Sequence, residues 1–439
     1  MSNKKPYQLH TLSNGLTVML VPMNGVRSLT VLAMVGTGSR FEDPKTAGIS
    51  HFLEHMVFKG TKSFPTALEL ASAIDTVGAE FNAYTSKEYT GYYVKAASEH
   101  LDLALDVVSD MLLTPKLREE DLEREKGVII EEMHMYEDTP MRHIGDIFED
   151  LMFAGSGLGK EIIGTEETVR SFHRSDFEAH LARWYGLKNV CFVIAGDSSV
   201  VSSKDMLSKV EHAFGKEFAP RTTAHTQTYV KKLAGSPISK GKKLLVSYKD
   251  TQQAHFIMSF PGLKRTDADR YALGVLSTLL GGNMSSRLFT EVREKRGLCY
   301  YVRSDEDHYH ETGMFGASAG VDPARVDEAV KVVREQMLLL LNETGQHAIT
   351  EEEVEKAKSH IVGSTILQFE DPQAVAQFYA GGKLLQDTVE TVEEKLEKLK
   401  KVTLDDVRTV ARRLIRPEEL FFAIIGPYKE EGKFEKLLR

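Results

Sequence analysis

The residues best suited to chemistry stand in a short apolar segment near the N-terminus, from Gly48 to Phe58. Read as a helix, this segment places His51, Glu54 and His55 at positions i, i+3 and i+4, so the three side chains leave from one face. Two imidazoles one turn apart can hold a Zn²⁺ ion, and the carboxylate between them can reach water bound to that ion. The spacing therefore predicts part of a zinc site with a general base beside it.

The alternative interpretation of this segment is a helix whose histidines are merely hydrogen-bonded and whose glutamate is solvated. The polar residues are interspersed with an apolar set, namely Ile49, Phe52, Leu53, Val57 and Phe58. The polar side chains would then lie near packed structure, where an unpaired charge is costly. For this reason we favour the metal site.

A zinc site with two histidines is incomplete, because catalytic zinc has three protein ligands and a water. Residues 119–137 are predicted to form a helix with an apolar stripe, made of Leu122, Ile129, Met133 and Tyr136. Glu125 and Glu132 fall on that stripe, where carboxylates are costly unless they meet a cation. Either residue is a candidate ligand, and the alternative is a glutamate that reaches solvent at the edge of the stripe. Glu131 points about 100° away and is the weaker candidate.

Bulk composition narrows the class of protein. The chain has 439 residues, of which 42% are hydrophobic and 27% charged, which is typical of a soluble globular protein with several domains. The net charge of -9 and the lack of a dense Lys/Arg block argue against a nucleic-acid partner. The two cysteines, Cys191 and Cys299, are too few for a disulfide framework and favour a reducing compartment.

The sequence also predicts that the protein is not a membrane protein. No apolar run approaches the roughly 18 residues that a membrane-spanning helix needs. Residues 16–21 alternate after the turn pair Asn14-Gly15, which favours a strand over a signal peptide. We expect a cytoplasmic protein, the alternative being one whose targeting segment has been removed.

The order of the predicted elements repeats. In the first half, strands at 16–21 and 29–35 precede the zinc helix, and two more strands precede the long helix at 119–137. In the second half, strands at 244–248 and 255–260 precede a helix at about 268–280 without histidine. Two more strands, at 300–303 and 314–319, precede long helices at 325–341 and 351–369. The repeat predicts two similar domains, 1–220 and 241–439, joined by a linker at 221–240.

A local similarity aligns the two halves. Residues 117–124 resemble residues 349–356, an offset of 349 - 117 = 232. This offset carries Glu125 onto Ala357 and Glu132 onto Ser364, neither of which is a metal ligand. We therefore expect one zinc ion per chain, held by the first domain.

Three motifs resemble one protein family. Residues 52–61 match the zinc helix of the M16 (pitrilysin-type) zinc peptidases, whose His-x-x-Glu-His order is the inverzincin motif. Residues 81–86 resemble the active-site edge strand of that family, and residues 123–133 resemble its third-ligand helix. The chain is most similar to the half-length M16B branch, which includes the mitochondrial processing peptidase β subunit and its bacterial relatives.

The resemblance implies a fold and a set of roles. The fold is α+β, with two tandem LuxS/MPP-like domains, each an antiparallel-rich sheet covered on one side by helices. His51, His55 and Glu132 would hold zinc, and Glu54 would be the general base. Glu125 would be a second acidic residue that orients a ligand.

The resemblance also implies where a substrate binds. An extended peptide would pair with the edge strand at Asn82, Ala83 and Tyr84. Arg293 and Tyr300 resemble the Arg/Tyr pair that contacts substrate, in the same subunit or in a partner. The alternative for Arg293 is a solvated arginine on a helix.

The expected function is therefore that of a zinc metalloendopeptidase acting on extended peptides. The alternative is a non-catalytic subunit of an M16 complex. Because one chain carries both the zinc motif and the Arg/Tyr pair, we expect a homodimer, with a heterodimer of related subunits as the other possibility.

Overall fold

The computed structural model describes residues 5–215 and 237–438, which form two compact units. The first unit comprises the described parts of 1–133, 160–234 and 366–391, and the second comprises those of 134–159, 235–365 and 392–439. The predicted linker at 221–240 lies mostly outside the described residues. Each unit therefore takes a short segment from the other half of the sequence as well as most of its own.

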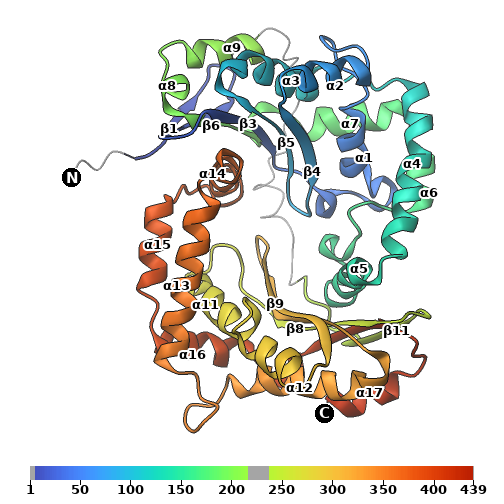
Figure 1. Cartoon of the computed structure of the whole chain (residues 1–439). Helices are drawn as coiled ribbons and strands as arrows, with labels where there is room; N and C mark the ends of the chain where they lie inside the picture. The colour runs from blue at the N-terminus through green and yellow to red at the C-terminus, as the bar shows by residue number, and fades with distance from the viewer. Residues whose placement is uncertain (1–4, 216–236, 439) are drawn as a thin grey trace. The chain divides into compact units, whose positions relative to one another are not determined.

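The first unit contains a six-stranded sheet in the order β1-β2-β6-β3-β5-β4 (Figure 1). Its strands are β1 Gln8–Thr11, β2 Thr17–Met23, β3 Ser28–Val35, β4 Glu80–Thr85, β5 Thr90–Ala97 and β6 Val190–Asp197. Strands β2 and β6 are parallel, and every other neighbouring pair is antiparallel. Strand β4 is therefore an edge strand, as the family resemblance implied for residues 81–86.

The second unit repeats this order in a five-stranded sheet, β7-β11-β8-β10-β9. Its strands are β7 Leu244–Tyr248, β8 Ala254–Pro261, β9 Cys299–His308, β10 Gly313–Val321 and β11 Phe421–Gly426. Strands β7 and β11 are parallel and the other neighbours are antiparallel, so the two sheets share one topology apart from β1. The prediction of two similar domains with antiparallel-rich sheets is confirmed.

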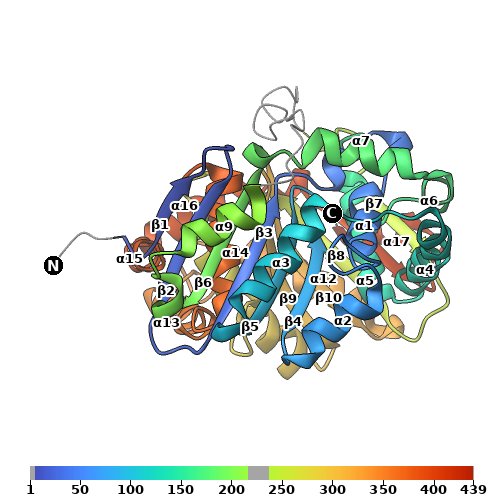
Figure 2. The same cartoon turned by 90° about the horizontal axis from the view of Figure 1, so that it is seen from above.

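Helices accompany each sheet. The described helices of the first unit are α1 Ile49–Met56, α2 Ala67–Thr76, α3 Leu101–Leu113, α4 Glu119–Glu137, α6 Glu166–Ser171, α7 Arg174–Trp184, α8 Ser198–Val201, α9 Met206–Gly215 and α14 Pro372–Gln386. Those of the second unit are α5 Pro140–Met152, α11 Arg270–Gly281, α12 Val326–Leu339, α13 Glu351–Gln368, α15 Val392–Lys400, α16 Leu404–Leu414 and α17 Glu431–Leu438. The division between the units falls within α4, after Met133, and within α13, after Thr365. Helices α3 and α9 lie over the strands of the first sheet (Figure 2).

One further helix packs on each sheet and comes from the other half of the sequence. Helix α14 packs on β3 and β6 of the first sheet, and α5 packs on β8 and β11 of the second. In β11, Phe422 and Ile424 face the larger helical layer, whereas Phe421, Ala423 and Ile425 face α5. This strand is buried on both faces, which explains its continuous apolar sequence.

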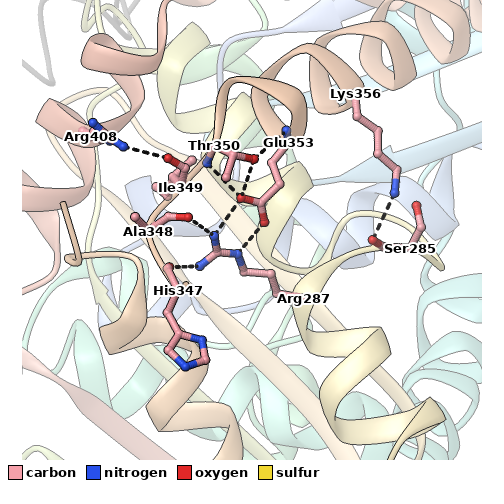
Figure 3. Close-up of polar contacts among 9 residues, drawn as sticks. All are labelled: Ser285, Arg287, His347, Ala348, Ile349, Thr350, Glu353, Lys356 and Arg408. Atoms are coloured by element: carbon pink, nitrogen blue, oxygen red, sulfur yellow. Dashed lines mark hydrogen bonds and ion pairs between the residues drawn. The ribbon is translucent and has the colours of Figure 1, made fainter. Parts of the chain in front are cut away.

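An arginine joins two segments of the second unit next to α13 (Figure 3). The Arg287 guanidinium donates to both carboxylate oxygens of Glu353, over 2.7 and 2.8 Å, and to the carbonyls of His347 and Ala348. Glu353 also accepts from the N–H of Thr350, forming a capping interaction at the start of α13. Since these donors are already used within the protein, the arrangement is structural.

Among the described residues, no helix is both long enough and apolar enough to cross a membrane.

Candidate metal centre

Helix α1 is fixed at its N-terminus by a buried carboxylate. Glu42 accepts hydrogen bonds from the backbone N–H groups of Gly48 (2.7 Å) and Ser50 (2.9 Å). Burial raises the pKa of Glu42 to about 7, although these bonds favour its charged form. Gly48 has a φ of 91°, and a Cβ there would lie 2.4 Å from the carbonyl oxygen of Ile163, so only glycine fits this entry to the helix.

The apolar face of α1 is packed as its sequence predicts. Ile49, Phe52, Leu53 and Met56 are each no more than 1% exposed. The ring of Phe52 packs edge-on against that of Phe177, with centroids 5.0 Å apart. Burial of this face holds the opposite, polar face of α1 in a defined position.

Helix α4 brings a carboxylate to the two histidines of α1. Oε2 of Glu132 lies 3.3 Å from Nε2 of His55 and 3.7 Å from Nε2 of His51. One ligand atom from each residue lies within 4.8 Å of the others, and this is the one such group of metal-binding side chains in residues 5–215 and 237–438. Glu131, one position earlier, is exposed and does not belong to the group.

This group has the donors and the spacing that zinc requires. Zinc–nitrogen and zinc–oxygen bonds of about 2.0–2.2 Å put the ligand atoms of a tetrahedral site roughly 3.3–3.6 Å apart. The separation from Glu132 to His55, 3.3 Å, lies in this range, and that to His51, 3.7 Å, lies just beyond it. Two imidazoles and one carboxylate are a donor set found in catalytic zinc sites. The residues therefore fit a zinc ion.

The two histidines differ in their surroundings. Burial lowers the pKa of His51 to about 4, so its imidazole is neutral at pH 7, as a ligand must be. Burial also lowers the pKa of His55, but hydrogen bonds to Glu125 and Glu132 outweigh this and raise it to about 9. A cation at His55 would therefore compete with a proton, and its binding would depend on pH.

Glu125 lies behind His55. Its Oε1 is 3.0 Å from Nδ1 of His55, and its Oε2 is 2.6 Å from Nζ of Lys59. Burial raises the pKa of Glu125, but these two partners outweigh it, and the pKa falls below its ordinary value. A carboxylate in this position fixes the tautomer and orientation of a ligating imidazole. The family resemblance implied this kind of role for Glu125, and the sequence reasoning missed Lys59, which stands four residues after His55.

Glu54 faces the edge strand of the sheet. Its Oε2 accepts a hydrogen bond of 2.6 Å from the hydroxyl of Thr85, the last residue of β4. Burial raises the pKa of Glu54, against the effect of this hydrogen bond. The sequence reasoning did not find Thr85, because no periodicity links it to residue 54.

The predicted substrate-binding residues of the first unit lie on β4. Ala83 is buried and faces the same side as Thr85, whereas Asn82 and Tyr84 face the other side. The ring of Tyr84 lies over Gly91 on β5, where a Cβ would come within 2.2 Å of it. Tyr84 is thus packed against its own sheet, and the outer backbone edge of β4 is the part that can pair with a peptide.

The predicted Arg/Tyr pair lies in the second unit. Arg293 belongs to a π-helical segment, Phe289–Glu294, which is the kind of helix irregularity often found at functional sites. Its guanidinium carbon is 5.6 Å from the centre of the Tyr300 ring, and the Tyr300 side chain is 75% exposed. The two side chains are therefore in contact, and a ligand can reach the exposed ring of Tyr300.

Comparison with known proteins identifies the family. Residues 18–166 match the family model described as Insulinase (Peptidase family M16), and residues 171–361 match that of the Peptidase M16 inactive domain. A protein of Streptomyces coelicolor named as an uncharacterized zinc protease is 37% identical over 96% of this chain and 90% of its own length. The chain belongs to peptidase family M16. A Bacillus subtilis protein with a similar name, YmxG, is 35% identical over 95% of this chain and 98% of its own length.

Solved structures support the M16 fold. A protease from Helicobacter pylori superposes with a TM-score of 0.83 at 23% identity, covering 96% of this chain and 99% of that one. A Pseudomonas fluorescens structure titled as a peptidase M16 inactive domain also gives 0.83, at 18% identity, over 97% of this chain and 98% of its own. At these identities the likeness establishes the fold and nothing finer.

Proposed function

We propose that this M16 protein is a zinc-dependent metalloendopeptidase that hydrolyses peptide bonds in extended or unfolded peptides. The observation that carries the proposal is the convergence of His51, His55 and Glu132 within 4.8 Å, with Glu54 on the same helix as the histidines. The relatives named zinc proteases add support, since they are similar over almost the whole chain.

The roles follow from the chemistry of each side chain. His51, His55 and Glu132 would hold one zinc ion, which as a Lewis acid lowers the pKa of water and polarises a peptide carbonyl. Glu54 accepts a proton from the attacking water and delivers it to the leaving amine. Glu125 orients His55 through Nδ1 and keeps Nε2 directed at the ligand group.

The substrate would add to the sheet as a further strand. A peptide paired with the outer edge of β4 at residues 82–84 runs past the helix that carries Glu54, and such pairing reads backbone shape more than side chains. Arg293 and Tyr300 would contact the substrate near the scissile bond, in their own subunit or in a partner. We propose a homodimer, which size-exclusion chromatography with light scattering can test.

Substitution of Glu54 tests the enzymatic proposal. Glu54→Gln keeps the shape of the side chain and removes its basicity, so peptide cleavage should fall by about 10²–10⁴-fold or more. Zinc content per chain, measured by atomic emission, should stay the same, because Glu54 is not a ligand. Cleavage of a fluorogenic peptide library at the wild-type rate by Glu54→Gln would refute the assignment.

A further inference from the structure

The hydroxyl of Thr85 joins the edge strand of the first sheet to the carboxylate of Glu54. Its Oγ1 donates to Oε2 of Glu54 over 2.6 Å, and it lies 3.5 Å from the carbonyl oxygen of Ser50. A threonine hydroxyl has one proton to donate, and a contact of 3.5 Å is weak. The proton therefore goes to Glu54, and a short bond to a carboxylate is among the stronger hydrogen bonds in proteins.

The backbone holds this hydroxyl in place. Thr85 pairs with Thr90 across the β4–β5 hairpin, and the N–H of Ser86 donates to the carbonyl of Tyr89 over 2.8 Å. A β-branched side chain on a strand also has few accessible χ1 rotamers. The donor is thus aimed with little freedom, whereas the glutamate that accepts from it has three rotatable bonds.

The bond also separates the two oxygens of the carboxylate. With Oε2 held by Thr85, Oε1 is the oxygen that can take a proton from water. The hydrogen bond from Thr85 to Oε2 also restricts the rotamers that the Glu54 side chain can adopt.

We propose that Thr85 is a positioning residue for the general base, an inference that rests on the peptidase function proposed above. The residues proposed to align a peptide, 82–84, directly precede Thr85 in the same strand. The strand that would fix the scissile carbonyl therefore also fixes the carboxylate that acts on the attacking water. A displacement of about 1 Å between such groups can reduce the rate of a reaction by about 100-fold.

Two substitutions at this position test the inference. Thr85→Val keeps the branched shape and removes the hydroxyl, and kcat for peptide cleavage should fall by about 10- to 100-fold. KM and zinc content should stay within about twofold, because neither substrate nor ligands are touched. Thr85→Ser keeps the hydroxyl and should recover most of kcat.

Thr90→Val is a matched control. Thr90 is the cross-strand partner of Thr85, and its buried hydroxyl donates to the carbonyl of Thr37 over 2.9 Å without contacting Glu54. Its loss should lower thermal stability and leave kcat within about twofold of wild type. A general effect of losing a buried hydroxyl in this hairpin would instead reduce kcat in both valine variants.

The outcomes separate this inference from the function on which it rests. A wild-type chain that holds zinc and cleaves no peptide overturns the proposed function and the role of Thr85 together. If the wild type is active, an unchanged kcat in Thr85→Val overturns the positioning role alone. The same follows if Thr85→Ser is as slow as Thr85→Val, or if Thr85→Val loses its zinc.

Discussion

In each unit a helix packs against the edge strand of the sheet. The two units differ in the chemical groups that lie between this helix and this strand. In the first unit, the hydroxyl of Thr85 on β4 meets the side chain of Glu54 on α1. In the second, the hydroxyl of Ser304 on β9 donates directly to the backbone carbonyl of Ser277 on α11. Four residues after Ser277 comes Gly281, where a Cβ would lie 2.3 Å from the backbone nitrogen of Ser304. The second unit therefore has no room for a side chain where the first has a carboxylate.

The long helices show the same contrast. Helices α4 and α13 start 232 residues apart, at Glu119 and Glu351, as the sequence offset predicted. Both bury a lysine that bonds a glutamate three residues earlier, Lys126 to Glu123 and Lys358 to Glu355. At the positions of Glu125 and Glu132, however, α13 has a buried alanine and an exposed serine. The scaffold is repeated, and the polar groups that need a cation occur in one copy.

The largest effect should come from removing one of the three proposed metal ligands of the first unit. Glu132→Gln replaces an anionic ligand oxygen by a neutral amide. The zinc affinity should fall by more than about 100-fold, which exceeds the loss typical for residues that only hydrogen-bond a ligand. Ser364→Ala changes the equivalent position of α13 and should leave zinc content and cleavage unaltered. Both are measured by equilibrium dialysis against a zinc chelator and by peptide cleavage.

A second control sharpens this test by one residue. Glu131→Gln removes a neighbouring exposed carboxylate and should retain zinc. Loss of zinc from Glu131→Gln with retention in Glu132→Gln would show that the ligand had been assigned to the wrong glutamate.

Local spacing explains which parts of the site could be predicted. His51, Glu54 and His55 lie within two turns of one helix, so periodicity alone identified them. On the second helix, periodicity left Glu125 and Glu132 as candidate ligands, and the resemblance to family M16 selected Glu132. The contacts of Thr85 to Glu54 and of Glu125 to Lys59 join residues 31 and more apart in the sequence. No pattern encodes such contacts, since they depend on how the elements pack.

The order of the helices and strands could also be predicted from local patterns, whereas the packing of distant elements could not. The order of strands and helices repeats in the sequence, but the packing of α5 and α14 on the sheets does not appear in any periodicity. Strand β9 was predicted only at 300–303 and extends to His308, because its charged residues Asp305, Glu306 and Asp307 resemble a loop. Pairing with β10 overrides that local preference.

Adding a side chain at Gly281, where α11 contacts β9 closely, should destabilise the second unit. Gly281→Ala forces a methyl group against the backbone of β9, which cannot move without breaking its pairing with β10. The cost should be about 1–3 kcal/mol, the usual range for overpacking, and should appear as a lower thermal unfolding temperature. Zinc content should not change.

Gly274 provides the matched control on the same helix. A Cβ there meets no atom closer than Oε1 of Glu306, at 3.4 Å, which is at the edge of ordinary contact. Gly274→Ala should therefore be neutral, or stabilising by up to about 1 kcal/mol from the higher helix propensity of alanine. Equal destabilisation by both substitutions would mean that the helix, and not its contact with β9, is sensitive at Gly281.

The smallest effect concerns a carboxyl group of the second unit that lies under α11. The Glu306 side chain points toward Gly274. Its Oε2 is buried and has no hydrogen-bond partner among the described residues. Burial raises the pKa of Glu306 to about 7, and the nearby charge of Asp307 adds to this. Unlike Glu54, this carboxyl accepts no hydrogen bond from a hydroxyl group in the part of the chain that the structure describes.

The sign of the pH dependence follows from this raised pKa. Between the unfolded value of 4.5 and about 7, the folded chain binds the proton more tightly, so the contribution to stability is complete below pH 4.5 and is lost as pH rises through 7. A pKa difference of this size is worth at most about 3 kcal/mol, and partial exposure reduces it to roughly 1–2 kcal/mol. Glu306→Gln cannot ionise, so it should unfold at a higher temperature than wild type at pH 8 and near the wild-type temperature at pH 4.5. Identical dependence of the unfolding temperature on pH in the two proteins would show that Glu306 is solvated. The second unit would then tolerate an ionised carboxylate under α11, as the first unit tolerates that of Glu54.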